Sequence, residues 1–185
     1  MKKTLTLVAL SSVSGLALAH GGSDTGAHHG FVEGLLHPFT GLDHLAAMLA
    51  VGVWSAGSAG RRWIAPLAFV AMLLIGALLS QAGLAPPGIE TMIAASLLVI
   101  GALLLAPRRP PLAIATALIG GFALFHGAAH GQELAGGPAL AGMALGTALL
   151  HGLGIALGTA LRRQAAWLPR ATGLGVALFG LGLLA

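Results

Sequence analysis

The sequence predicts an all-α fold, a polytopic membrane bundle of six transmembrane helices preceded by a cleavable signal peptide. Of its 185 residues, 57% are hydrophobic and only 8% are charged, whereas a soluble domain carries about 25% charged residues. The apolar residues form six long segments, and the basic residues lie in the short connectors between them. This pattern excludes a soluble globular enzyme and a disordered chain. The absence of Cys excludes thiolate metal sites and cysteine nucleophiles.

Residues 1–19 have the layout of a signal peptide. Lys2 and Lys3 form a positive start, an apolar stretch runs to Leu18, and Ala-Leu-Ala over residues 17–19 matches a small-residue cleavage site. The alternative, an uncleaved first membrane helix, is disfavoured because the apolar stretch is short and interrupted by serines. Cleavage after residue 19 makes His20 the first residue of an extracytoplasmic His- and Gly-rich segment over residues 20–33.

Residues 34–185 form the predicted six-helix transmembrane domain. Each apolar segment is near the roughly 20 residues that a helix needs to cross a bilayer. Gly, Pro or Arg residues mark the connectors between the segments. The predicted spans are 34–59, 63–84, 89–106, 112–129, 138–161 and 168–185.

Charges set the predicted orientation. Acidic side chains fall near one side of the bundle, at Asp24, Glu33, Glu90 and Glu133, and arginines fall in the alternate connectors. The positive-inside rule then places the arginines in the cytoplasm and both mature termini on the periplasmic side of a bacterial inner membrane. Short basic pairs between apolar runs fit a lipid bilayer as partner and argue against nucleic acid. The arginines are Arg61, Arg62, Arg108, Arg109, Arg162, Arg163 and Arg170.

Small residues recur on the predicted helix faces. Spacings such as Gly142/Gly146 and Gly154/Gly158, and the glycines of the last segment, let helices approach closely in lipid. We expect these glycines to pack within the bundle, and the same faces also permit a homo-oligomer.

The end of the fourth segment carries the most informative polar residues. His126 and His130 are one helical turn apart, and Glu133 follows three residues later. At about 100° per residue, the three side chains lie within about 60° of one another on one face. Two imidazoles at i and i+4 suit a divalent transition metal. A pair of merely solvated polar residues at the membrane surface is the alternative.

The first segment carries a second polar motif, His37, Asp43 and His44. On a straight helix His37 and His44 would lie about 10.5 Å apart, too far for one metal ion. Pro38 at the start of the helix, or Gly41 within it, permits a break that brings His37 back. We expect His44 to be a direct ligand, and Asp43 either to bind metal or to orient an imidazole by accepting its second N–H.

Three further residues are weaker candidates for metal ligands. His151 lies deeper in the fifth segment and is either a second station on a route inward or a core imidazole bonded to a backbone carbonyl. Glu90 begins the third segment, where it either guides cations or caps a solvated helix. The amine and imidazole of His20 form a chelating pair if cleavage occurs, although a flexible polar remnant fits equally well.

Only nitrogen and oxygen donors are present, and these suit Ni²⁺, Co²⁺, Cu²⁺ or Zn²⁺ without naming one. One role that such donors in a membrane bundle permit is transport of a divalent transition metal, with no resident cofactor and no catalytic site. Two alternatives are an intramembrane zinc-dependent hydrolase, since three His and an Asp across helices suit catalytic zinc, and a non-transporting metal-binding accessory protein.

In these motifs the chain resembles the HupE/UreJ family of nickel permeases. The family's first pattern, a His followed after five residues by Asp-His, matches His37, Asp43 and His44. Its second pattern, Phe-His-Gly before an acidic residue, matches residues 125–127 and Glu133. The resemblance covers essentially the whole chain. It implies secondary uptake of Ni²⁺ across the inner membrane for hydrogenase or urease maturation, and it implies that His37, Asp43, His44, His126 and Glu133 are the transport residues.

Overall fold

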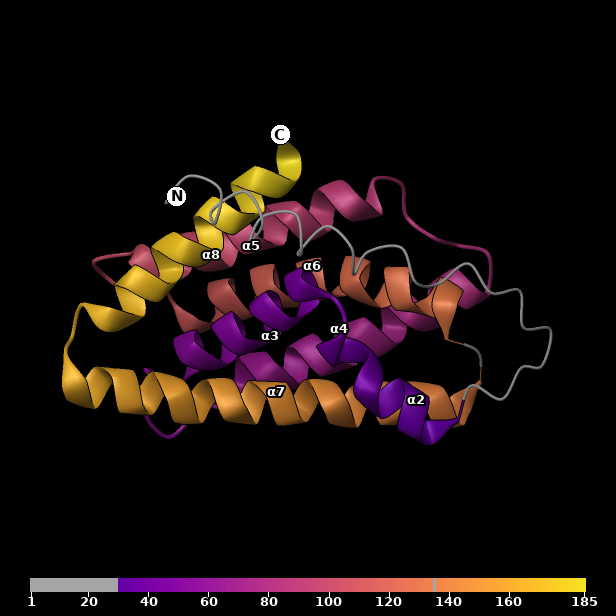
Figure 1. The fold of residues 1–185 in the computed structure, drawn as a ribbon, viewed down its shortest axis with the longest axis horizontal. Coiled ribbons are helices and arrows are strands. Elements are labelled where there is room, and N and C mark those ends of the chain that lie inside the picture. Colours follow the sequence, from indigo (N-terminus) through magenta and orange to yellow (C-terminus); the bar gives the residue numbers. More distant parts are fainter. Residues whose placement is uncertain (1–29, 135) are drawn as a thin grey trace, which may run out of the picture.

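The protein is described by a computed structural model, in which residues 30–134 and 136–185 are placed. These residues form seven α-helices and one short 3-10 helix, with no strand among them (Figure 1). The all-α prediction is therefore confirmed for this part of the chain. The predicted signal peptide, His20 and most of the 20–33 segment lie outside the described residues. The elements are α2 (Phe31–Leu36), η1 (His37–Phe39), α3 (Leu42–Ser55), α4 (Ile64–Gln81), α5 (Ile89–Leu105), α6 (Leu112–Glu133), α7 (Gly137–Gln164) and α8 (Leu168–Leu184).

Helices α4, α6 and α7 are long and apolar enough to cross a membrane. Helices α3, α5 and α8 are also apolar, but they contain only 14, 17 and 17 residues. Five of the six predicted spans coincide with single helices, α4 to α8. The outer surface of the bundle is apolar, with Leu67, Leu153 and Leu178 more than half exposed, as a helix in contact with lipid requires. That six helices cross the membrane stays a prediction.

The prediction of one helix over residues 34–59 is wrong. Helix α2 ends at Leu36, η1 makes a tight turn around Pro38, and α3 begins only at Leu42. Proline fixes φ and has no N–H to donate, so it fits the first turn of a helix and breaks a helix interior. Gly41, with φ −94° and ψ 121°, adopts an extended conformation that separates η1 from α3. The break therefore lies between the two halves of the His37 and Asp43-His44 motif.

Closely packed pairs build the bundle: α4 with α6, α5 with α8, and α7 with both α2 and α3 (Figure 1). Glycines make several of these approaches. A Cβ atom on Gly127 of α6 would collide with the Leu73 carbonyl of α4, and one on Gly154 of α7 would collide with the Leu49 carbonyl of α3. Packing within the chain is thus confirmed for most predicted glycines. The exceptions, with no neighbour within 4 Å of such a Cβ, are Gly121, Gly175 and Gly182.

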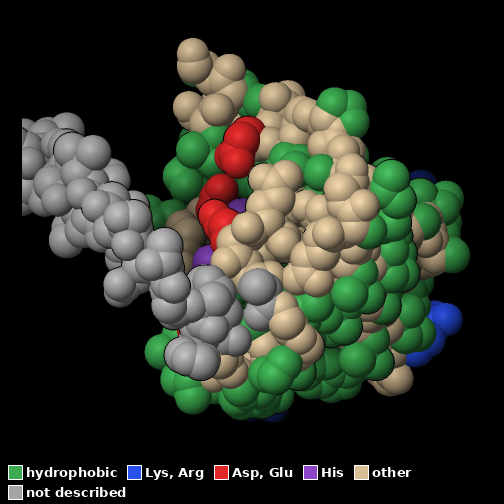
Figure 2. All heavy atoms as spheres, turned by 90° about the vertical axis from the view of Figure 1, so that its right-hand side faces the viewer, with side chains coloured by type: hydrophobic (Ala, Val, Ile, Leu, Met, Phe, Trp, Pro, Cys, Tyr) green, Lys and Arg blue, Asp and Glu red, His purple; other side chains and the backbone are tan. Residues whose placement is uncertain are grey.

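Acidic and basic side chains lie at opposite ends of the bundle. Figure 2 looks onto the end where carboxylates and imidazoles gather. All four described acidic residues line one hollow there. Arg61 and Arg109 line a different hollow, where the connectors before α4 and α6 meet the end of α3. The predicted segregation of charge is confirmed for the described residues.

Candidate metal site

A hollow of about 1080 Å³ opens at the acidic end of the bundle. Its walls come from the α2–η1–α3 segment, the start of α5 and the end of α6. Figure 2 shows red carboxylates and purple imidazoles along it. The break at Pro38 and Gly41 lets His37 and His44 both face this hollow. The polar side chains that line it are Glu33, His37, Thr40, Asp43, His44, Glu90, His130 and Glu133.

Three of these side chains, His37, His130 and Glu133, touch one another and form what we call the outer cluster. The Nε2 atom of His37 lies 2.8 Å from Nδ1 of His130 and 2.9 Å from Oε2 of Glu133. The same His130 nitrogen lies 3.6 Å from that carboxylate oxygen. The side chain of Glu133 is 62% exposed and that of His37 is 21% exposed, so the cluster is open to water.

The outer cluster has the dimensions of a transition-metal site. All three ligand atoms lie within 4.8 Å of one another. Imidazole nitrogens and carboxylate oxygens that share an ion at about 2.1 Å are spaced about 3.0–3.4 Å apart in tetrahedral or octahedral geometry. The observed separations of 2.8, 2.9 and 3.6 Å bracket that range. Small shifts of the side chains would therefore let all three atoms coordinate one cation.

A row of four imidazoles leads from the outer cluster into the bundle. The ring centroids are 4.6 Å apart for His37 and His130, 4.3 Å for His130 and His44, and 4.7 Å for His44 and His126. In this histidine row, the side chain of His37 is 21% exposed, whereas His130, His44 and His126 are all buried, and His126 is fully buried. The two sequence motifs, which lie on different helices, therefore meet in one continuous polar path.

Neighbouring groups fix the tautomer of His126. The Ser96 hydroxyl, on α5, donates its single proton to the carbonyl of Ile93 and lies 2.8 Å from Nε2 of His126. Because that proton is used, the serine oxygen must accept a hydrogen bond from Nε2–H of His126. The opposite nitrogen, Nδ1, then carries a lone pair, and it is buried with no partner among the described residues. A free lone pair on a buried imidazole is the state that a metal ligand requires.

The same arrangement recurs at His44 and His151. Asp43 Oδ1 accepts from Nδ1–H of His44 at 2.9 Å, and the Met48 carbonyl accepts from Nδ1–H of His151 at 2.8 Å. In each ring the other nitrogen, Nε2, is buried with no partner in the described chain. We call His44, His126 and His151 the inner imidazoles. Of the two expectations for Asp43, orientation of an imidazole is the one that this geometry supports.

The remaining candidates differ in position. His151 makes the predicted bond to a backbone carbonyl. It is separated from His126 by Phe69, whose ring centroid lies 5.6 Å from His126 and 5.0 Å from His151. Glu90 lines the hollow but is absent from the outer cluster. His20 lies outside the described residues.

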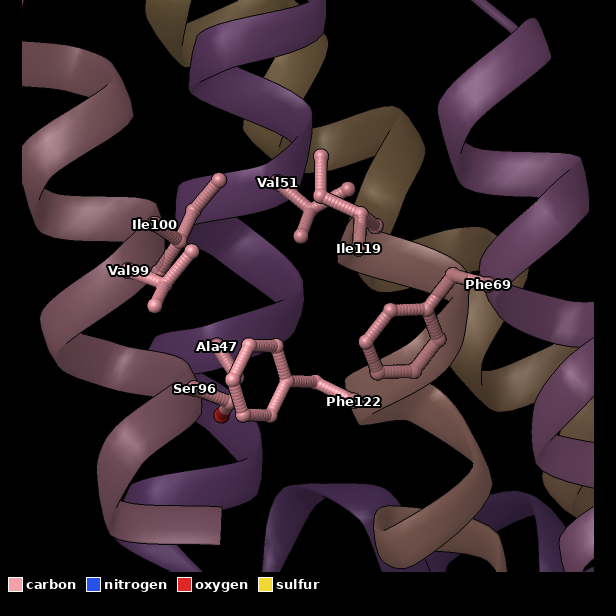
Figure 3. Close-up of a pocket in the computed structure, with 8 residues that line it drawn as sticks. All are labelled: Ala47, Val51, Phe69, Ser96, Val99, Ile100, Ile119 and Phe122. Carbon is pink, nitrogen blue, oxygen red and sulfur yellow. The ribbon is translucent and has the colours of Figure 1, made fainter. Parts of the chain in front are cut away.

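Sequence reasoning missed Ser96 and Phe69. Ser96 could have been noticed as a polar residue in an otherwise apolar helix. Phe69 carried no signal, because an aromatic residue in an apolar helix is ordinary. Both residues contact His126, and both line a small cavity together with Val51 and Ile119 (Figure 3). This cavity holds only about 10 Å³, about the least that one water molecule needs, so apolar side chains close the polar path on its inner side.

Comparison with known proteins shows the family of the chain. The family model described as HupE / UreJ protein matches residues 8–183. The chain belongs to the HupE/UreJ family. A curated relative named Protein HupE, from Rhizobium leguminosarum bv. viciae, is 43% identical over 135 residues, which cover 72% of this chain and 68% of the relative. No solved structure matches this HupE/UreJ family member.

Proposed function

We propose that this HupE/UreJ family member is a secondary transporter, a permease that takes up Ni²⁺ or a similar divalent transition metal across the bacterial inner membrane. Nickel taken up in this way would supply hydrogenase or urease maturation. The observation that carries the proposal is the histidine row, in which four imidazoles run from an open, acidic hollow to the fully buried His126. A purely structural role leaves unexplained why several buried ring nitrogens have no partner.

The acidic hollow is the capture side in this proposal. Four carboxylates line it and attract divalent cations, while the arginines gather at the opposite end. With the arginines in the cytoplasm, the hollow opens to the periplasm. The outer cluster then takes the metal from water, because its three donors already lie within 4.8 Å of one another.

The inner imidazoles receive the ion in the second step. A divalent cation that loses water in a membrane interior needs replacement ligands, or the desolvation cost is prohibitive. His44 and His126 offer buried lone pairs whose direction is set by Asp43 and Ser96. His151 is the next free nitrogen inward, beyond the ring of Phe69. Transfer to it requires that the apolar cavity around Phe69 opens, so this conformation is closed toward the arginine end.

The membrane potential is a sufficient driving force for such a carrier. The potential contributes about 4.6 kcal/mol per 100 mV for a divalent cation, twice the value for a single charge. The sequence contains nothing that resembles a P-loop, and none of its connectors is long enough for a nucleotide-binding domain. Uptake would therefore proceed without ATP.

Radiometal flux tests the proposal. The full chain is reconstituted in liposomes with an inside-negative potential, and entry of ⁶³Ni²⁺ is measured with and without competing Co²⁺, Cu²⁺ or Zn²⁺. We expect potential-dependent accumulation that His126→Ala abolishes, with Gln132→Ala, an exposed residue on the same helix, as the matched control. Binding of Ni²⁺ without flux would instead indicate an accessory protein. Turnover of amide or ester lipids with added Zn²⁺ would indicate the intramembrane hydrolase.

A further inference from the structure

Two arginines converge on one point at the end of the bundle opposite the metal site. A Cβ atom on Gly57, just after α3, would collide with Nη1 of Arg109 and would lie 2.9 Å from Nη2 of Arg162. Arg109 comes from the connector between α5 and α6, and Arg162 from the last turn of α7. Both guanidinium groups therefore occupy the space that the missing side chain of Gly57 leaves open.

The position of Arg109 is fixed by Trp54. Its Nη2 donates to the Trp54 carbonyl, and its Cζ atom lies 4.4 Å from the centre of the indole ring. A guanidinium held by a hydrogen bond and by stacking loses little further entropy when it binds a ligand. Burial, and to a smaller extent the nearby charge of Arg162, lower the pKa of Arg109.

No carboxylate among the described residues neutralises this pair. Every acidic side chain in residues 30–134 and 136–185 lines the hollow at the other end. Arg109 and Gly57 line a hollow of about 330 Å³ together with Trp54, Ser58 and Arg61, and Arg162 reaches its edge at Gly57. The indole N–H of Trp54 is buried and has no hydrogen-bond partner in the described part of the chain. The hollow therefore combines positive charge and hydrogen-bond donors, with no carboxylate among the described residues in its wall.

We propose that Arg109 and Arg162, assembled around Gly57 and Trp54, form a binding site for a phosphate group. The arginine fork matches phosphate oxygens bidentately. The group comes either from the headgroup of an anionic phospholipid or from free inorganic phosphate. Exposed Trp63 and Trp167 lie in the connectors of the arginine end, and tryptophan is enriched where a protein meets the headgroup layer. Basic pockets between membrane helices are known to hold anionic headgroups.

A charge-matched pair of double variants tests this site. Arg109→Gln/Arg162→Gln removes the converging pair, and Arg108→Gln/Arg163→Gln removes the same charge from the adjacent positions in the chain. Binding of phosphatidylglycerol, phosphatidylcholine and inorganic phosphate to the full chain in detergent is measured by native mass spectrometry and by the shift in unfolding temperature. We expect affinity for phosphatidylglycerol to fall about tenfold or more in the first double variant and less than about twofold in the second.

Gly57→Ala is the variant that changes no charge. Its Cβ atom would displace both guanidinium groups, so it should weaken phosphatidylglycerol binding even if loss of Arg109 destabilises the chain. Binding of phosphatidylglycerol that phosphate displaces supports the lipid as source, and binding of phosphate alone supports the free anion. Equal losses in both double variants, or no binding of either ligand, would overturn the proposal. These measurements use no metal, so their outcome is separate from that of the transport proposal.

Discussion

The outer cluster and the inner imidazoles use the same side chain in two different settings. In the outer cluster, His37 and His130 contact each other and the carboxylate of Glu133, in a place open to water. Each inner imidazole instead gives one N–H to a fixed oxygen, and its other nitrogen is buried with no partner among the described residues. In the proposed transport, the grouped donors of the outer cluster would bind the ion first. The singly oriented donors of the inner imidazoles would then receive it.

The largest expected effect on Ni²⁺ binding and uptake together comes from His130→Ala, because His130 belongs to the outer cluster and also contacts His44. Both Ni²⁺ binding, measured by calorimetry, and ⁶³Ni²⁺ uptake should fall by at least about a hundredfold, the upper range for groups that merely orient a ligand. The control is Gln132→Ala, which should stay within about twofold of the wild type. If His130→Ala took up ⁶³Ni²⁺ at the wild-type rate, His130 would not connect the outer cluster to the inner imidazoles in transport.

A second prediction separates packing from chemistry. Gly127 lies between His126 and His130, and a Cβ atom there would collide with the Leu73 carbonyl of α4. Gly127→Ala should therefore lower the free energy of unfolding by about 2 kcal/mol, measured by denaturant unfolding in detergent. The matched control on the same helix is Gly121→Ala, whose Cβ has no neighbour within 4 Å. A stable Gly127→Ala variant would show that α4 and α6 are not held at this close distance.

The third prediction concerns Asp43, which accepts the N–H of His44. Asp43→Asn removes the charge that orients this imidazole, so ⁶³Ni²⁺ uptake should fall about tenfold. Binding of Ni²⁺ to the outer cluster should persist, because Asp43 is not one of its three members. If binding and uptake fell together, Asp43 would be a direct ligand, and the division between the two regions would need to be redrawn.

The smallest expected effect is that of Ser96→Ala. Loss of the hydroxyl leaves Nε2–H of His126 without its acceptor, which costs about 1 kcal/mol of stability and should slow uptake a few-fold. Ser55→Ala is the control, because that buried hydroxyl has no partner among the described residues. The NMR tautomer signals of His126 in the wild type and in Ser96→Ala check the assignment directly. Identical signals would remove the argument for a fixed inner donor.

Much of this arrangement could be predicted from local sequence. Helical periodicity alone placed His126, His130 and Glu133 on one face of a helix, and α6 carries them in that way. Apolar segment length located α4 to α8. The position of the break near Pro38 was open to prediction because proline acts on its own turn of the chain.

The rest depends on contacts between distant segments. The position of α2 depends on its packing against α7, where Gly34 meets the backbone of Ala139. The partners of His126 and His151 depend on how α5 and α3 are rotated toward α6 and α7. That rotation decides whether Ser96 or the Met48 carbonyl faces an imidazole. No local sequence pattern predicts it.

The turn at η1 has a consequence for how a captured ion would leave. His37 is attached to the α2–α7 pair, through Gly34 and Ala139, whereas His130 and Glu133 belong to the α4–α6 pair. A cation bound by the outer cluster would therefore be held by residues from both of these helix pairs. A small shift of the α2–α7 pair relative to the α4–α6 pair would remove the His37 donor from the outer cluster. The remaining two donors would bind the cation more weakly, and no helix would have to unwind.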